Sequence, residues 1–283
     1  MSKKKFLAIY AKSFNWAGAF LPKETYEDCS SLYNFCRSVD DIADCRDKLN
    51  VKVEKLNTFI NSFNSKNCDD EIITDMKRLI TKYNISDKII FDLFDGVKTD
   101  LVDKLEFLSE KEIFLYSYRV AGTVGLMMAK ILRVNDRVAL LGAIDLGIAM
   151  QLTNIARDVI EDKISNRYYI KSSFGDLKNT IDIADKFYDN AFFSIRAIPL
   201  RMRFAIIVAR RVYRKIGYKI LSCGNFENYK KSGRIYVHNI EKIFETIISL
   251  FDLLKLSFVK KRADITVQYH RLINEDIDYN ARF

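Results

Sequence analysis

Two acidic segments of the chain have the side-chain types and spacing of a divalent-cation site. In the first, "FCRSVDDIAD" (residues 35–44), Asp40 and Asp44 lie four positions apart. They share one face of a helix that advances by about 100° per residue, while Asp41 points about 100° away from Asp40. Like charges at this spacing destabilise a helix by a few tenths of a kcal/mol, so the pair indicates a counter-charge. Mg²⁺ would supply it, because Mg²⁺ binds carboxylate oxygens together with waters and substrate phosphates.

The second segment, "AMQLTNIARDVIED" (residues 149–162), gives a matching polar stripe. On the same helical geometry four oxygen-bearing side chains fall within about 80°: Gln151, Asn154, Asp158 and Asp162. A surface helix is the alternative for either stripe alone, but such a helix normally carries mostly Lys and Glu. Together the stripes predict a shared site in which four aspartates hold two or three Mg²⁺ ions on a diphosphate. The basic side chains that complete the phosphate clamp would be Arg37, Arg157 and Arg167.

Between the two stripes, "YSYRVAGTVGLMMAKIL" (residues 116–132) is rich in small residues. Each glycine in a helix interior costs about 1 kcal/mol, so this segment needs a reason for its composition. Two interpretations stay open. The first is close packing against another helix. The second is a helix break beside a ligand pocket lined by Leu126, Met127 and Met128.

The elements that position these residues are predicted to be helices. The 283 residues are 49% hydrophobic and contain only two prolines and ten glycines, too few for the many tight turns of an all-β fold. No repeat or Pro/Gly/Ser-rich linker divides the chain, so a single all-α domain over residues 1–283 is expected. The helix that carries the first acidic pair is expected to begin near Tyr26, after Pro22 and with Thr25 as its cap. Residues 222–233 are expected to form a mobile loop.

Composition and motifs limit the classes of binding partner and exclude several types of active site. Lys and Arg exceed Asp and Glu by 46 − 37 = 9, which suits a phosphate group or an anionic membrane. No nucleic-acid-binding motif occurs, and nucleic acid is not expected as a partner. No dinucleotide-binding or P-loop glycine motif occurs, and neither histidine, His238 or His270, has a zinc-site context. Five cysteines without CxxC spacing indicate reduced thiols and a cytoplasmic location.

The longest apolar stretch, residues 243–259, is interrupted by Glu245, Asp252 and Lys255 and is too short to span a membrane. It predicts an amphipathic helix that closes the core. The alternative is a helix on a membrane surface, favoured by the basic run at residues 260–262. That alternative predicts peripheral attachment to the inner face of an anionic membrane.

Taken in order, three segments resemble the motifs of the squalene and phytoene synthase family of head-to-head prenyl transferases. "LYNFCRSVDDIAD" is similar to the first aspartate-rich motif, "YRVAGTVGLMM" to the central signature, and "QLTNIARDVIEDKISNRYYI" to the second aspartate-rich motif. The resemblance covers most of the chain. It implies the class I isoprenoid synthase fold, an all-α bundle around a central cavity.

The resemblance also implies roles for individual residues. Asp40 and Asp44 would bind Mg²⁺, or Mn²⁺ in its place, at one rim of the cavity. The ligands at the other rim would be Asn154, Asp158 and Asp162, with Gln151 adjoining. The positions that match diphosphate-contacting or pocket-shaping residues are Tyr33, Arg37, Tyr116, Arg157, Arg167 and Tyr169, with Tyr213 and Arg234 matching more loosely. Tyr116 and the four aspartates would be the catalytic set.

Two departures from the family pattern are visible. Ala11 stands where some family members have a serine that contacts phosphate. After the second motif, Asn166 replaces the usual glycine, and Ile170 and Lys171 replace Leu-Pro. The second departure predicts a loop of different shape.

The activity that the resemblance implies is condensation of two geranylgeranyl diphosphates to phytoene through a cyclopropylcarbinyl diphosphate, the first committed step of carotenoid biosynthesis. No NADPH is expected for that reaction, and a desaturase acting on phytoene would be the downstream partner. The first alternative is a dehydrosqualene or squalene synthase that uses farnesyl diphosphate, with NADPH if the product is squalene. The second is a non-catalytic assembly or lipid-binding relative, although both aspartate motifs are intact.

Overall fold

The structure, a computed structural model, describes residues 12–258 and 265–283. The predictions made at Ala11 and at the basic run 260–262 therefore lie outside the described residues. Within the described ranges the regular structure is helical, and the one β-type contact is an isolated parallel bridge between Leu105 and Arg167. The longer elements are α2 (Lys12–Gly18), α3 (Lys23–Asp44), α4 (Leu49–Asn64), α5 (Glu71–Tyr83), α6 (Asp87–Thr99), α7 (Glu110–Ser117), α8 (Thr123–Ile131), α9 (Arg137–Arg157), α10 (Val159–Ile164), α11 (Phe174–Ser194), α12 (Leu200–Leu221), α13 (Phe226–Ser232), α14 (Asn239–Phe258) and α15 (Val267–Asn274). Short π- or 3-10-helical turns are η1 (Tyr118–Gly122), η2 (Ile195–Ala197) and η3 (Tyr279–Ala281). The all-α prediction is confirmed.

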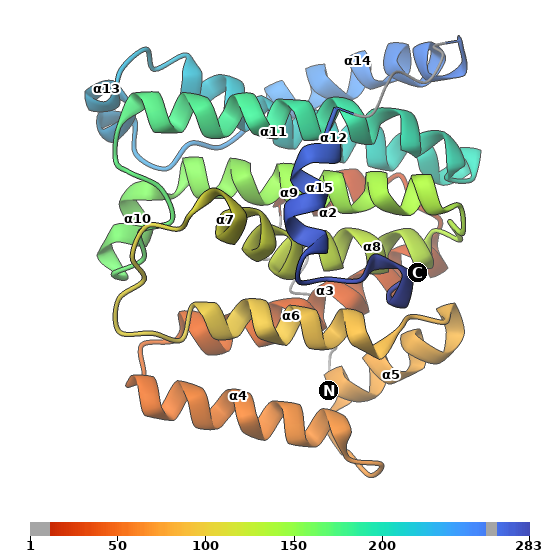
Figure 1. Ribbon diagram of the computed structural model, residues 1–283. Helices are drawn as coiled ribbons and strands as arrows, with labels where there is room; N and C mark the ends of the chain where they lie inside the picture. Colours follow the sequence, from red (N-terminus) through yellow and green to blue (C-terminus); the bar gives the residue numbers. More distant parts are fainter. Residues whose placement is uncertain (1–11, 259–264) are drawn as a thin grey trace.

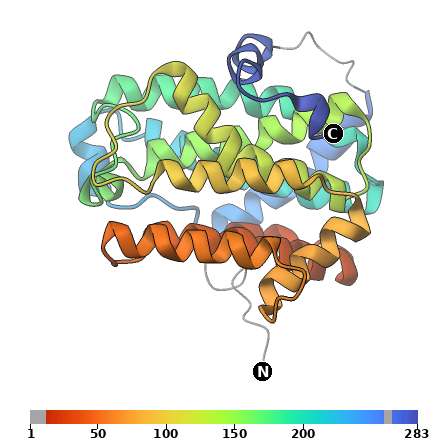
Figure 2. The ribbon, with the colours of Figure 1, turned by 60° about the horizontal axis from the view of Figure 1, so that its bottom comes forward.

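The helices are stacked in layers around α9 (Figure 1). Helices α11, α12 and α14 form one side, α3 and α6 lie on the other side of α8 and α9, and α4 and α5 form the far edge. Figure 2 shows these layers with the α4 and α5 side brought forward. Among the described helices α9 is the one long and apolar enough to cross a membrane, but 67% of its most apolar window is buried by the rest of the protein.

The glycines of the central segment serve close packing between backbones. A Cβ added to Gly125 would lie 2.2 Å from the carbonyl oxygen of Ala143, and one added to Gly147 would lie 2.2 Å from that of Ala121. Larger side chains at either position would push α8 and η1 away from α9. The close-packing interpretation of this segment is therefore confirmed at Gly125.

The alternative interpretation of the same segment is partly right. Residues Tyr118–Gly122 form a π-helical turn, so the helix is irregular at the central signature. Of the three predicted pocket residues, Met128 lines the cavity described below. The prediction is wrong for Leu126 and Met127, which are fully buried in the hydrophobic core because they point to the other side of α8.

Two local predictions are corrected by the helix boundaries. Helix α3 begins at Lys23, directly after Pro22, and Thr25 donates to the sulfur of Met202 instead of capping the helix. The proposed mobile loop at residues 222–233 contains α13, whose first turn is capped by Asn225. The Thr25 hydroxyl bonds to α12 and so does not cap α3, and the Asn225 cap begins a helix within the expected loop.

Helix α14 is amphipathic, as predicted, but it does not close the core. Its buried residues include Lys242, Glu245 and Ser249, while most of its large apolar side chains are exposed. The polar side of the helix is turned inward because it forms ion pairs with α12. The prediction of a core-closing apolar face is therefore wrong.

Candidate active site

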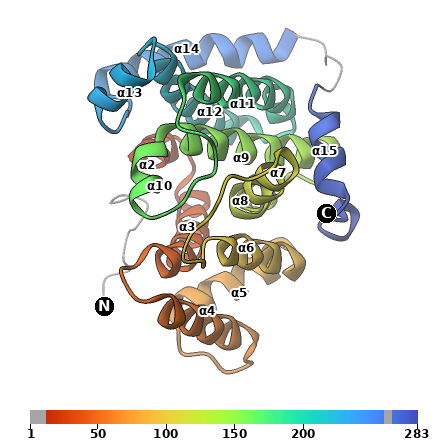
Figure 3. The same ribbon diagram turned by 60° about the vertical axis from the view of Figure 1, so that its left-hand side comes forward.

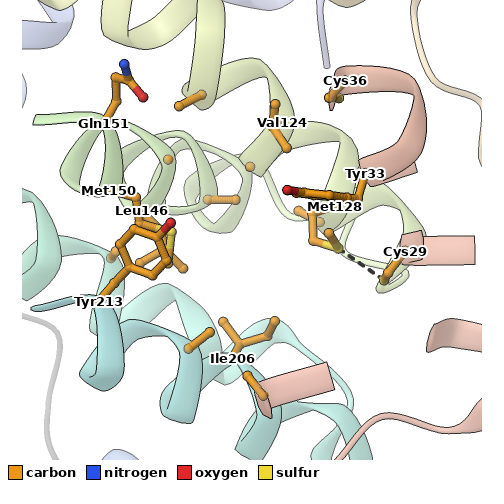
Figure 4. A pocket seen from close by; sticks show the side chains of 18 of the residues that line it. Cys29, Tyr33, Cys36, Val124, Met128, Leu146, Met150, Gln151, Ile206 and Tyr213 are labelled. Carbon is orange, nitrogen blue, oxygen red and sulfur yellow. Dashed lines mark hydrogen bonds between the residues drawn. The ribbon is translucent and has the colours of Figure 1, made fainter. Parts of the chain in front are cut away.

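The ends of several helices meet at one end of the bundle, at the left in Figure 1. Helix α3 ends there at Asp44, α6 ends just before Asp100, and α9 passes into α10 at Asp158. A cavity of about 680 Å³ runs from this end into the bundle between α2, α3, α8, α9 and α12. Figure 4 shows Tyr33 of α3, Met128 of α8 and Tyr213 of α12 around one shared space.

The cavity combines a polar mouth with an apolar interior. Its polar lining includes nine of the residues predicted from the sequence: Tyr33, Arg37, Asp40, Tyr116, Gln151, Asn154, Arg157, Tyr213 and Arg234. The other five predicted residues do not line it but are joined to the mouth by contacts described below: Asp44, Asp158, Asp162, Arg167 and Tyr169. The structure thus gathers all fourteen at one end of the molecule.

At the first rim, Arg37 is a counter-charge to the acidic cluster of α3. Its guanidinium lies 3.0 Å from Asp40, 2.5 Å from Asp41 and 3.8 Å from Asp44. Asp41 is therefore part of the charge cluster, although it does not line the cavity. Burial in the mouth, followed by repulsion from Asp44, raises the pKa of Asp40 to about 7 despite Arg37. This carboxyl is therefore about half-ionised at neutral pH, and added positive charge would favour its ionised form.

The second rim differs from the continuous helix predicted for residues 149–162. Helix α9 ends at Arg157, Asp158 has φ −104° and ψ 14°, and α10 begins at the next residue. The hydroxyl of Tyr229 donates to the carbonyl oxygens of Ala156, at 3.1 Å, and Arg157, at 2.7 Å. These carbonyls lie at the last turn of α9, so the contact from α13 stabilises the break. The predicted single stripe is consequently two short stripes joined at a bend.

Asp158 is bound by arginines from both directions. The guanidinium of Arg157 makes a two-pronged contact with its carboxylate, with Nε at 2.8 Å from Oδ1. Arg234 adds contacts of 3.2 Å to both carboxylate oxygens. Tyr213 lies beside Arg157 and hydrogen-bonds with it. The two loosely matched positions, Tyr213 and Arg234, therefore do reach the second rim.

Asn154 and Asp162 complete that rim. The amide nitrogen of Asn154 donates to Gln151 at 3.4 Å, and its amide oxygen is buried with no hydrogen-bond partner among the described residues. Burial, and next the charge of Asp158, raises the pKa of Asp162 to about 7. Both observations leave oxygen atoms at this rim that a cation would satisfy.

Arg167 connects the two rims. Its guanidinium donates to Asp44 Oδ1 at 2.8 Å and to the carbonyl oxygen of Ala43 at 3.0 Å. Its backbone is held by the bridge to Leu105, in which Leu105 N donates to Asn166 O at 2.9 Å and Tyr168 N donates to Leu105 O at 3.0 Å. Arg167 is thus fixed by backbone hydrogen bonds in a position to reach α3.

The turn before Arg167 has a left-handed residue. Asn166 adopts φ 56°, a conformation that glycine and asparagine tolerate best. The absence of the family's glycine at this position is therefore compatible with a left-handed turn.

One site residue was not found from the sequence. Asp100 is buried and accepts hydrogen bonds from the hydroxyls of Tyr116, at 2.9 Å, and Tyr169, at 2.5 Å. The two tyrosine rings stack with centroids 4.9 Å apart, and their hydroxyls lie 3.0 Å from each other. Burial raises the pKa of Asp100, and burial with the nearby Asp100 charge raises the pKa of Tyr116 well above its usual value. A lone carboxylate after the apolar "FDLFDGV" was the only signal in the sequence.

The donor set fits Mg²⁺ in type and is divided between the rims. In the described part of the chain no three His, Cys, Asp or Glu side chains gather as a ready metal cluster. Instead each rim carries carboxylates, of which Asp40 and Asp162 have a raised pKa, and the second rim adds the unsatisfied oxygen of Asn154. These are hard oxygen donors, which suit a hydrated Mg²⁺ that also binds substrate phosphates. The residues that would hold it are Asp40, Asp44, Asn154, Asp158 and Asp162.

The comparisons with known proteins agree with this geometry. The profile of the family described as squalene/phytoene synthase matches residues 7–171, which include both acidic motifs and the central signature. A phytoene synthase of Pseudescherichia vulneris is 28% identical over 251 residues, covering 77% of this chain and 81% of that protein. A 4,4'-diapophytoene synthase of Staphylococcus haemolyticus is also 28% identical, over 262 residues, covering 82% and 90%.

Solved structures show the same fold. A dehydrosqualene synthase in complex with a ligand has a TM-score of 0.72 at 24% identity, covering 88% of this chain and 94% of that one. A squalene synthase from Alicyclobacillus acidocaldarius has a TM-score of 0.64 at 18% identity, covering 78% and 92%.

Proposed function

The chain belongs to the squalene/phytoene synthase family of prenyl transferases, and from this membership we propose that it condenses two geranylgeranyl diphosphates to phytoene. The observation that carries the proposal is the cavity of about 680 Å³, with its arginine- and aspartate-bearing mouth and apolar interior. A prenyl diphosphate has the same two parts, a charged head and a hydrocarbon tail. We also propose that residues 1–283 form a single domain.

The arginines of the mouth hold and stabilise the diphosphate. Arg37, Arg157 and Arg234 line the cavity, and Arg167 closes the gap between the rims. Guanidinium groups bind phosphate oxygens in two-pronged contacts and do not lose their charge. Mg²⁺, when bound, would neutralise the diphosphate as it leaves. The arginines receive the departing diphosphate when the bond between its oxygen and the allylic carbon breaks. The double bond of the second substrate attacks the resulting cation, and loss of a proton gives the cyclopropylcarbinyl diphosphate. Departure of its diphosphate, ring opening and loss of a second proton give phytoene.

Asp100 and its two tyrosine partners form a hydrogen-bonded group next to the cavity mouth. Tyr116 lines the cavity, while Asp100 and Tyr169 hold its hydroxyl in a fixed place. The Tyr116 hydroxyl stays protonated at neutral pH, because its pKa is raised. Its one hydroxyl proton is donated to Asp100, so we infer that Tyr116 shapes the mouth beside the substrate diphosphate and does not itself donate a hydrogen bond to it.

The interior protects a carbocation from premature capture. Most of the wall consists of apolar side chains, which exclude water. Two thiols, Cys29 and Cys36, also line it, and burial raises the pKa of each to about 12. They therefore remain neutral thiols and not reactive thiolates. Cys29 is further engaged with the sulfur of Met128, at 3.1 Å (Figure 4).

The proposed C20 substrate is supported by the small side chains deep in the cavity and by the relatives named phytoene synthase. Small lining residues of α9, α11 and α12 include Ala139, Gly142, Ala143, Ala191, Ala205 and Ala209. The alternative is a C15 substrate, favoured by the equally similar 4,4'-diapophytoene synthase. We propose the cytoplasm as location, consistent with five free cysteines, and a desaturase as the downstream partner.

The test is a product analysis. Purified protein is incubated with Mg²⁺ and either geranylgeranyl or farnesyl diphosphate, with and without NADPH, and the hydrocarbon is identified by mass spectrometry. A C40 product formed without NADPH supports the proposal. A C30 product overturns the chain length, and no product from either substrate, with Mg²⁺ or Mn²⁺, indicates a non-catalytic relative.

A further inference from the structure

Helix α14 presents a continuous apolar face to solvent. Six of its large apolar side chains are between 49% and 65% exposed: Ile243, Phe244, Ile247, Leu250, Phe251 and Leu254. Ile240 and Phe258 extend this α14 apolar face at its two ends and are 82% and 84% exposed. The spacing of three and four residues places all eight on one side of the helix. Helix α14 forms the outer edge of the bundle, with α12 beneath it (Figure 3).

Ion pairs with α12 fix this orientation. Lys219 lies 2.7 Å from Glu241, and Arg211 lies 2.8 Å from both Glu245 and Asp252. Those are all three acidic residues of α14, so its outer face carries no negative charge. The indole of Trp16 donates to Thr246 at 3.0 Å on the same inner side. The helix is therefore held with its polar side inward and its apolar side outward.

Such a face requires a partner that removes it from water. From Ile240 to Phe258 it runs for about 27 Å at 1.5 Å per residue. Scattered exposed apolar residues are ordinary, but contiguous patches of this kind mark interaction sites. A helix with one apolar face, lying parallel to a surface, is the form in which interfacial helices bind lipid.

The charges beside the α14 apolar face match an anionic bilayer. Lys255 is exposed next to it, and the sequence continues with Lys260, Lys261 and Arg262 directly after the helix. The protein carries a net charge of +9. Basic residues close to a membrane surface are attracted by anionic headgroups, each by about 1 kcal/mol.

The face is also continuous with the cavity mouth. The segment that leads into α14 lines the cavity with Arg234, Ile235, Tyr236 and Val237. Tyr236 is 62% exposed, and Ile240, the first member of the face, is four residues later. The α14 apolar face is thus joined along the chain to the lining of the cavity.

We propose that the α14 apolar face inserts into the surface layer of an anionic phospholipid membrane and places the cavity mouth beside it. The choice of lipid rests in part on the proposed function, since prenyl substrates and a hydrocarbon product partition into membranes. A second copy of the chain is the competing occupant.

The experiment is co-sedimentation of the full-length protein with vesicles of phosphatidylcholine, with or without phosphatidylglycerol, in the absence of substrate. The wild type should bind the anionic vesicles, most strongly at low salt. The affinity of the variant Ile247→Glu/Phe251→Glu for these vesicles should be lower by roughly tenfold or more, because two charges would enter the interface. The matched control Val53→Glu/Val138→Glu makes the same change at exposed apolar positions on α4 and α9 and should bind like the wild type.

Size-exclusion chromatography and circular dichroism of all proteins complete the test. A wild type that fails to bind either vesicle, or a control that loses binding as fully as the α14 variant, would overturn the proposal. A stable dimer that dissociates on the α14 substitutions, with no vesicle binding, would assign the face to a second copy. Vesicle binding by a protein that forms no hydrocarbon would leave this inference standing while the proposed function fails.

Discussion

Arg167 donates to Asp44 at 2.8 Å across 123 residues of sequence, and this pair joins the two acidic motifs at one end of the bundle. The backbone of Arg167 pairs with Leu105 in the isolated parallel bridge, while its guanidinium contacts the end of α3. Each rim by itself is a cluster of carboxylates paired with arginine. The Arg167 contact makes them a single mouth.

Replacing Arg167 by lysine should lower kcat/KM by about 100-fold with little change in melting temperature. Lysine keeps the charge but cannot hold Asp44, the Ala43 carbonyl and a diphosphate with a planar fork. Steady-state kinetics and thermal unfolding measure the two effects. The control is Arg78→Lys, at an exposed arginine that pairs with Asp28 far from the mouth, where activity should be preserved. Unchanged kcat/KM in Arg167→Lys would contradict the role of this residue.

Asp100→Asn should lower kcat by about tenfold or more, because the amide no longer accepts strongly from both Tyr116 and Tyr169. The substitution is nearly isosteric, so the helical circular dichroism should persist. Asp92 offers a control outside the cavity, since this buried carboxylate accepts from Tyr118 at 2.9 Å and also forms an ion pair with Arg282 at 2.8 Å. Asp92→Asn should reduce stability and leave kcat unchanged. Equal activity losses in the two variants would show that Asp100 acts only through stability.

The sequence predicted the class and the site better than it predicted the local geometry. The acidic stripes and the arginines could be found because their spacing and chemistry are local properties. The bend at Asp158 could not, because it involves the contact of Tyr229 with the end of α9. Asp100 was missed for the same reason: its tyrosine partners lie 16 and 69 residues away. The helix in residues 222–233 was missed although its cap, Asn225, is a local signal. The α14 apolar face was assigned to the core because hydrophobic periodicity does not say which side of a helix meets the protein.

Asn166 should tolerate glycine but not valine. Its φ of 56° costs a β-branched residue about 1–2 kcal/mol, and the strain would displace Arg167. Asn166→Gly should keep wild-type kcat/KM, while Asn166→Val should lose stability and activity together. Asn84, with φ 50° at the end of α5, provides the comparison. Asn84→Val should lose similar stability, measured by urea unfolding, and retain activity.

Because of Asp28, the free energy of unfolding should depend on pH in the acid range. Burial raises its pKa, but hydrogen bonds from Lys82, Tyr83 and Arg78 outweigh burial and hold the pKa below its usual value. A carboxyl with a lowered folded-state pKa contributes stability above its unfolded pKa of about 3.8, and that contribution is lost as pH falls through the folded value. Asp28→Asn should therefore cost about 3 kcal/mol at pH 7 and distinctly less near pH 3, in urea unfolding.

The exposed neighbour Glu24, which also pairs with Lys82, is the control for Asp28. Glu24→Gln should leave the free energy of unfolding nearly unchanged, as expected of a surface ion pair. An Asp28→Asn deficit that is independent of pH would argue that the cluster contributes through packing and not through charge.

Asp40→Ala should abolish turnover while leaving the metal-free protein as stable as the wild type or slightly more so. Asp40 and Asp44 repel each other across one face of α3, and the substitution relieves that repulsion. In the wild type, Mg²⁺ with inorganic diphosphate should raise the melting temperature, because a ligand bound only by the folded state stabilises it. The variant should lose most of that shift.

Asp47→Ala supplies the control for charge, since it removes an exposed carboxylate that pairs with Lys55 shortly after α3. It should keep both turnover and the Mg²⁺-dependent shift. Marked unfolding of Asp40→Ala in metal-free buffer would identify Asp40 as a structural residue. A full Mg²⁺-dependent shift in that variant would remove it from the metal site, because a lost ligand must weaken the binding that produces the shift.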